Sequence, residues 1–455
     1  MAVNTSNQYT GAMQRALQRE VLPIAQRYLV AHQHAEKKKL QHGNGVTWTA
    51  TRFNRLPLPF APLSEGVPPI GEQLSISQVT GVAIQWGDKI TLSDVSIIVT
   101  YYDLVKEARK LLGVQIAETH ERNAMFCLMG SSQVNYVNVR GSRAALVAGD
   151  VMDTVTLNRT YSDLQTLGAP FIGGQMEPDI TRDIEHGAKA SEKGPMNSDH
   201  YVAIVHPLVA NDLRQNAAVQ TAYSYSDITR LYINEFGYWS GIHMTWSNMV
   251  PQFSGQAAPA GAGALTGTLP AGTYAIQITG TDTLNLRGEQ YISQVQTGIV
   301  VGGSGTGSIT VTVPANTNFT YTVYISAAGS TLPNNIAVTS TSGVGSPTSG
   351  PLTGQATQIL PGSAITLTAL GAYQIAPAAP ATGVTVFPTF VMGEQYYACL
   401  ELEDVSYTFL GEADKSDPLN QLRVIGWKLF EGWVILNQQF GCRIESTASN
   451  TGVFG

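Results

Sequence analysis

The chain has 455 residues, a formal net charge of -7 and 43% hydrophobic residues, so it is long enough for two or three domains with real cores. Charged residues make up only 13%, about half of the roughly 25% usual in soluble domains, which favours sheet-rich surfaces that a partner covers. The acidic balance argues against a general DNA binder. Three widely spaced cysteines argue against a disulfide framework or a zinc site, and a reducing cytoplasm fits them best. No secretion signal and no apolar run long enough for a bilayer is found, so we expect no membrane association.

The N-terminal 45 residues form a basic arm. They carry a charge of +4 and leave -11 for the rest of the chain. Residues 9–34 look helical but are interrupted by Pro23, so two short helices or one kinked helix are expected. Lysines 37–39 contact either nucleic acid or an acidic partner, or they belong to a solvated helix end at residues 32–39.

An extended loop is expected next, at residues 46–80. Residues 46–53 alternate in strand fashion, a proline-rich stretch follows at 56–71, and a strand returns over 74–86 before a turn at Gly87 and Asp88. A loop of this length and proline content seldom packs on its own domain, so we expect it to lie on a neighbour.

One long helix is predicted over residues 92–128, with Ser93 as its N-cap and Gly130 beyond its end. Its apolar stripe and its charged face consist of two sets of residues. The stripe is Ile98, Tyr102, Val105, Leu112 and Ile116, and the charged face is Asp103, Lys106, Glu107, Lys110, Glu118 and Glu121. Such a helix, on the order of 50 Å long, suits a spine that crosses several elements.

The remainder reads as α+β material interrupted by a second module. Strands are expected at 134–147, 151–157, 201–205 and 242–247, with helices at 161–168 and 208–215. Residues 254–388 contain only three charges, Asp282, Arg287 and Glu289, and short alternating runs between Gly, Pro and Asn, as in a β-sandwich. This segment resembles the immunoglobulin or fibronectin type III domains inserted in phage structural proteins. Strands then resume at 394–402 and 405–410, and a last segment at 424–437 completes the interrupted domain.

A set of short motifs occurs in a characteristic order. They are RFNRLP (52–57), LSEGVPP (63–69), QWGD (85–88), VHP (205–207), EFG (235–237), SDPLNQ (416–421) and GWK (426–428). Together they resemble the major capsid proteins of tailed double-stranded DNA bacteriophages, in the branch like the N-four coliphage coat protein, which have the Hong Kong 97 fold.

That resemblance implies a fold and a set of partners. The implied parts are an N-terminal arm (1–45), an extended loop (46–80), a peripheral domain (81–150), an axial domain with its return (151–253 and 389–455), and the inserted β-sandwich (254–388). It implies self-assembly into hexamers and pentamers of an icosahedral shell in the host cytoplasm, and a virion location. It also implies a scaffolding protein, a portal and a decoration protein as partners, and non-specific DNA contact at most. No lysine lies between Lys39 and Lys89, so an isopeptide cross-link from the loop is not expected.

Candidate intersubunit contacts follow from the extended loop and the spine helix. They are Arg52, Arg55, Glu65, Trp86, Asp88, Asp103, Lys106 and Lys110. For Arg52, Arg55 and Glu65 the alternative is a solvated side chain without a partner in another subunit. No catalytic, cofactor-binding or metal-binding residue is predicted, and we expect no enzyme. Two alternatives stay open. The 254–388 segment could bind glycans, a host surface or a decoration protein, and residues 183–200, with His186 and His200, could do acid–base chemistry.

Overall fold

The computed structural model describes residues 30–41, 43, 45–54, 56, 58, 71–99, 103–172, 200–216, 219–221, 232–284, 286–326, 328–329, 335–339, 364–373, 377–410 and 421–450. Most of the arm and the proline-rich centre of the loop therefore lie outside the described residues. No helix of the described part is both long and apolar enough to span a membrane. The chain is mixed α+β, as expected, with many more strands than helices.

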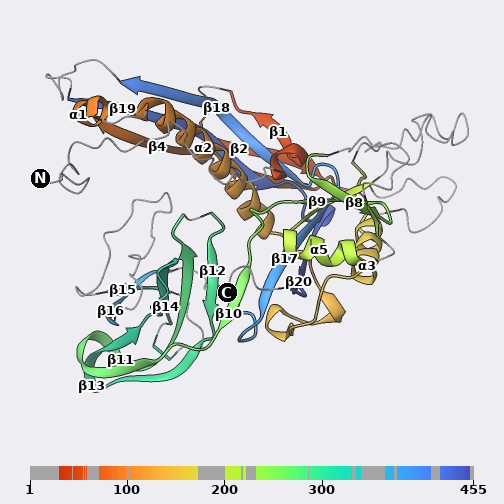
Figure 1. Ribbon diagram of the computed structural model, residues 1–455. Coiled ribbons are helices and arrows are strands. Elements are labelled where there is room, and N and C mark those ends of the chain that lie inside the picture. The colour runs from red at the N-terminus through yellow and green to blue at the C-terminus, as the bar shows by residue number, and fades with distance from the viewer. Residues whose placement is uncertain are drawn as a thin grey trace, which may run out of the picture. The chain divides into compact units, whose positions relative to one another are not determined.

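The described residues divide into two compact units, one formed by 87–116 with 405–428 and the other by the remainder. A four-stranded sheet has the order β1 (Glu36–Lys39), β18 (Tyr397–Leu410), β19 (Leu422–Ile435) and β4 (Ile84–Ser93) (Figure 1). The expected turn at Gly87 and Asp88 is wrong, because β4 continues through it. Gly87 permits a close approach there, since a Cβ on it would lie 2.7 Å from the carbonyl oxygen of Trp427.

The prediction of one helix over residues 92–128 is wrong near its N-terminal end. Helix α1 spans Asp94–Val99, and helix α2 spans Leu104–Met129. Ser93 does cap α1, because its Oγ accepts a hydrogen bond from the Ser96 amide at 3.2 Å. Asp103 then caps α2 in the same way, accepting from the Lys106 amide at 3.1 Å, and so starts a second helix. Helix α2 continues through Gly113 and ends one residue before Gly130.

The main sheet of the second unit is covered on both faces. Strands β17 (Thr385–Met392), β6 (Tyr201–Val205), β9 (Ile242–Trp246) and β8 (Glu235–Trp239) lie side by side, and β20 (Gly441–Ser446) pairs with β17 and with β5 (Val134–Tyr136). Figure 1 shows α3 (Thr154–Thr166) and α5 (Pro207–Gln215) beside these strands. Tyr201, Ala203 and Val205 pack in the cluster with α3 and α5. Val202 and Ile204 pack with the C-terminal turns of α2. All five residues of β6 are therefore buried, as a strand covered on both faces requires.

Between α2 and β6 the sequence prediction was only partly right. Residues 134–147 form the short strand β5 and two 3-10 turns, Val137–Val139 and Arg143–Ala145, instead of one strand. The strand expected at 151–157 is mostly helix, because the Asp153 carboxylate accepts from the Thr156 amide at 2.8 Å and begins α3 there. The strand at 201–205, the helix at 208–215 and the strand at 242–247 are confirmed within one residue.

The strands of residues 253–373 surround a core of their own. They are β10 (Phe253–Gln256), β11 (Gly261–Asp282), β12 (Glu289–Ser293), β13 (Gln296–Thr312), β14 (Phe319–Ile325), β15 (Asn335–Thr339) and β16 (Ala364–Tyr373). Pairing runs from β11 through β13, β16, β15 and β14 back to β11, so these five strands close a ring. Tyr274, Ile276, Val301, Val311 and Tyr321 are among the side chains buried within it. Residues 302–308 belong to strand β13.

The ends of this segment meet at one place in the sheet. Strand β10 pairs antiparallel with β17, with Phe253 opposite Val386. The Arg143 guanidinium lies 4.2 Å from the centre of the Phe253 ring, and its Nη1 donates to the carbonyl of Ala378 at 3.2 Å. Its other nitrogens hold the buried carboxylate of Glu445, with 2.8 Å between Nε and Oε2. Arg143 therefore ties both ends of the segment to strand β20.

The first described residues of the arm are anchored by a buried carboxylate. Glu121 of α2, expected on the solvated face, is fully buried, and its Oε1 accepts from the amides of Val30 and Ala31 at 2.9 and 3.0 Å. Burial raises the pKa of the Glu121 carboxyl, and the amide donors of Ala31 and Val30 oppose that rise. Tyr397 donates its hydroxyl to the carbonyl of Ala31. Lysines 37–39, expected either to contact a partner or to lie at a helix end, form strand β1 beside β18.

Substitution of this anchor gives a stability test. We expect Glu121→Ala to lower the free energy of unfolding by about 2–3 kcal/mol, because two buried amides lose their acceptor. Lys106→Ala, on an exposed position of the same helix, should change it by less than about 0.5 kcal/mol. Urea denaturation followed by tryptophan fluorescence measures both. Equal changes for the two variants would show that Glu121 does not anchor the arm.

Candidate assembly interface

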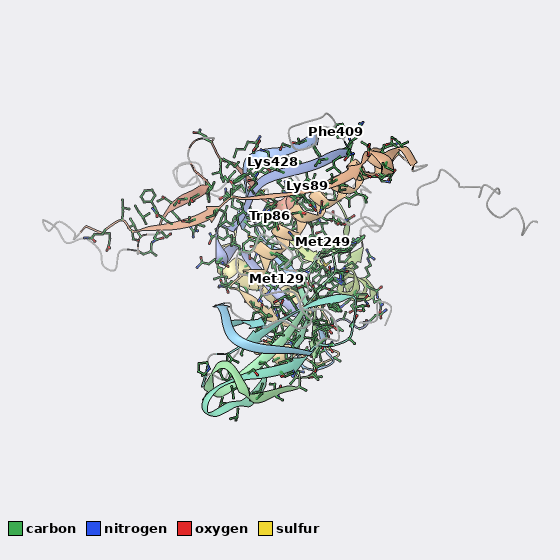
Figure 2. All side chains as sticks on the ribbon, turned by 90° about the vertical axis from the view of Figure 1, so that its left-hand side faces the viewer. Trp86, Lys89, Met129, Met249, Phe409 and Lys428 are labelled. Atoms are coloured by element: carbon green, nitrogen blue, oxygen red, sulfur yellow. The ribbon has the colours of Figure 1, made fainter. Side chains whose placement is uncertain are left out.

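The extended loop contains a two-stranded hairpin that pairs with no other strand in the described part of the chain. Strand β2 (Thr47–Phe53) runs antiparallel to β3 (Ile76–Val82), with Thr47 opposite Val82 and Phe53 opposite Ile76. In Figure 2 the side chains of this orange hairpin, at the left, project from both sides of its two strands. The strand at 46–53 is thus confirmed, and the returning strand divides at Ala83 into β3 and β4.

Large apolar side chains of this hairpin and its flanks are exposed. Phe53 is 65% exposed, Ile76 54%, Leu74 68% and Leu58 87%. An isolated hairpin of two strands is marginally stable in water, because it lacks a layer on which to bury an apolar face. The hairpin therefore carries apolar area that the described chain leaves uncovered.

The hairpin is closed at its base and contacts the rest of its chain at two points. At the base the Ala83 amide donates to the carbonyl of Val46 at 2.9 Å, which continues the pairing of β2 with β3, and Ala83 itself is buried. Arg52, predicted as an intersubunit contact, donates from Nη2 to the carbonyl of Leu436 at 2.8 Å within the chain. Gly81 allows close packing, since a Cβ there would lie 2.5 Å from Cδ1 of Leu400.

The unit formed by 87–116 and 405–428 also has exposed apolar and basic side chains. Val95 is 62% exposed, Ile98 80% and Tyr407 59%. Lys106 and Lys110, predicted as contacts, are exposed on α2, whereas Asp103 serves as its N-cap. Sequence analysis missed Val95 and Tyr407 as candidates and placed Ile98 on a buried stripe. The sequence does not show which residues of a strand are exposed unless the neighbouring strands and helices are known.

The same unit has an open groove of about 450 Å³. It is lined by Gly87, Asp88, Lys89, Trp427 and Lys428, among others, and Figure 2 labels both lysines. Asp88 accepts from Nε2 of Gln115 at 2.6 Å, and Gln115 in turn accepts from the Trp427 indole at 3.0 Å. Asp88 therefore has a partner within the chain, which positions β4 and β19 on α2.

The other predicted contacts are differently placed. Trp86 is half-buried, with the Arg122 guanidinium 5.4 Å from its ring centre. Arg55 and Glu65 lie outside the described residues. The structure thus describes Arg52, Trp86, Asp88 and Asp103 with partners in their own chain, and Lys106 and Lys110 as exposed side chains.

The residues considered for acid–base chemistry do not form an accessible site in the described chain. Asp183, Glu185, His186 and Asp199 lie outside the described residues. His200 is buried, with Nε2 2.6 Å from the Tyr232 hydroxyl and its ring 4.4 Å from that of His243. His243 pairs with the buried Glu235. Burial lowers the pKa of the neighbouring His34 to about 3, so that ring stays neutral. This arrangement is a packed polar network without access for a substrate.

Comparison with solved structures identifies the fold. The capsid of Ralstonia phage GP4 matches with a TM-score of 0.51 and 10% identity, over 99% of this chain and 100% of that chain. The capsid of the cyanophage Pam1 matches with a TM-score of 0.50 and 10% identity, over 97% and 98%. No family model and no curated protein matches the sequence. The chain therefore has the fold of phage capsid proteins over nearly its whole length, and the fold class expected from the sequence motifs is confirmed.

The exposed apolar side chains of the hairpin can be tested without disturbing the subunit. We expect the double variant Phe53→Ser with Ile76→Ser to change the free energy of unfolding by less than about 1 kcal/mol, since both residues are mostly exposed. The same variant should lose most of its assembly, measured as the fast-sedimenting fraction. Gln78→Ser, at an exposed polar position of the same strand, is the matched control. Normal assembly of the double variant would exclude the hairpin from the interface.

Proposed function

We propose that the protein is the major capsid subunit of a tailed phage and that its copies assemble, as hexamers and pentamers, into the icosahedral shell around the double-stranded DNA genome. One observation carries the proposal: a capsid fold matched over nearly the whole chain presents a hairpin whose apolar side chains are left exposed by the described part of the chain. Such a subunit needs interfaces more than it needs an active site.

In this proposal each hairpin lies on a neighbouring subunit. The receiving surface is the apolar and basic one that carries Val95, Ile98, Tyr407, Lys106 and Lys110. A hairpin docked in this way makes a heterologous contact, in which two different patches meet, and such contacts close into rings when rotational symmetry allows. Complete burial of each large apolar side chain would contribute roughly 1.5–3 kcal/mol, so a few residues per subunit suffice for cooperative assembly.

The same proposal concerns the partners. Without a lysine in the extended loop, the shell relies on non-covalent contacts there. A separate scaffolding protein, a portal and a decoration protein are the partners that we propose, with assembly in the host cytoplasm and non-specific contact with DNA at most. Binding of glycans or a host surface by residues 254–388 stays a prediction.

Imaging of the assembled product tests the proposal. We expect the full chain, co-expressed with its candidate scaffolding protein, to form closed icosahedral shells in negative-stain electron microscopy. Uniform monomers or small rings that persist when the scaffold is present would contradict it and would favour a portal or tail protein.

A further inference from the structure

Three side chains of the types that bind transition metals meet in the second unit. They are His120 of α2, Cys399 of β18 and Glu431 of β19, and one ligand atom of each lies within 4.8 Å of the others. Cys399 and Glu431 are buried, and the His120 side chain is 19% exposed. No other group of three such side chains lies this close together in the described part of the chain.

We infer that His120, Cys399 and Glu431 form a binding site for Zn²⁺ or a similar divalent transition-metal ion. Imidazole nitrogen, thiolate sulfur and carboxylate oxygen are the three ligand types that Zn²⁺ takes in proteins. Zinc bond lengths place ligand atoms about 3.3–3.8 Å apart around a tetrahedral ion, so ligand atoms that lie within 4.8 Å of one another must shift by about 1 Å, the separated ones closer and the touching ones apart. Two of them already touch, because Nδ1 of His120 contacts Oε2 of Glu431. The ion would lie between these two atoms, and a proton on Nδ1 would move to Nε2 of the same ring, so that the imidazole stays neutral and no proton is released there.

Neighbouring groups hold the ligands as the outer partners of metal sites do. Nδ2 of Asn123 donates to Oε1 of Glu431 at 2.8 Å, which fixes the carboxylate and leaves Oε2 toward His120. The Trp433 ring lies 5.0 Å from the His120 ring and shields it. Three protein ligands leave a fourth position for water, and His32, with its ring 4.4 Å from that of His120, is a nearby further donor.

Charge and proton balance are both met when the ion binds. Cys399 is a free and buried thiol, so it enters the site as S–H. Binding exchanges one proton for the ion: the S–H bond breaks, the sulfur–metal bond forms, and the proton passes to solvent. The ion's two positive charges balance the thiolate and the carboxylate in a buried place.

Cobalt(II) is the probe, because a cobalt-bound thiolate gives a charge-transfer absorption band that zinc does not show. We expect the EDTA-treated full chain to develop this band, together with the visible bands of tetrahedral cobalt, with a stoichiometry of one. Cys399→Ser should abolish the charge-transfer band, and His120→Gln, at a partly exposed position, should weaken cobalt binding at least about tenfold. The other two thiols provide matched controls, since Cys127→Ser and Cys442→Ser should keep the band.

The controls separate loss of the site from loss of the fold. Tryptophan fluorescence verifies that each variant is folded, and His120→Gln decides the question if Cys399→Ser does not fold. A folded native chain without the charge-transfer band would overturn the inference. A band that survives Cys399→Ser or depends on Cys127 would overturn it as well. Shell formation is not part of the measurement, so the inference stands or falls independently of the proposed function.

Discussion

A two-stranded sheet buries an apolar face only where another element covers it, and in the described chain the β2–β3 hairpin has no third strand and leaves the apolar side chains at its far end uncovered. Its backbone pairs along seven residues of each strand, so its register is set, yet Phe53 and Ile76 at one end remain in solvent. In the proposed shell a neighbouring subunit would cover these side chains, since every subunit offers a receiving surface and every hairpin can dock on one.

The rest of the second unit shows the opposite situation. Strand β6 is covered on both faces, by α3 and α5 on one side and by the end of α2 on the other. The described end of the arm is attached to this covered core through Glu121, and the 254–388 segment is attached through Arg143. In the proposed assembly, a subunit with such a core would keep its own fold while its hairpin forms contacts with a neighbour.

The features that the sequence predicted well depend on neighbours along the chain. Ser93 caps α1 by accepting from the amide three residues ahead. The alternation at 46–53 marks a strand, and a continuous apolar run marks β6. The predictions that failed concern residues whose contacts lie far away in the sequence. Glu121 has the periodicity of a solvated face, and only the amides of Val30 and Ala31, about ninety residues earlier, explain its burial.

The proposed interface and the proposed metal site could not be predicted from the sequence for the same reason. His120, Cys399 and Glu431 have no recognisable spacing, because a helix and two strands from distant parts of the chain bring them together. The exposed Val95 and Tyr407 could not be found without the sheet order. Local caps were also overlooked: Asp103 and Asp153 are ordinary N-cap residues, and attention to them would have placed the starts of α2 and α3.

Amide hydrogen exchange of the hairpin tests the central claim most directly. Mass spectrometry of residues 47–53 and 76–82 compares the unassembled subunit with the assembled shell. The account predicts fast exchange in the subunit and strong protection in the shell, because a neighbour covers the hairpin only after assembly. Equal exchange in the two states, with the β6 amides protected in both, would contradict it.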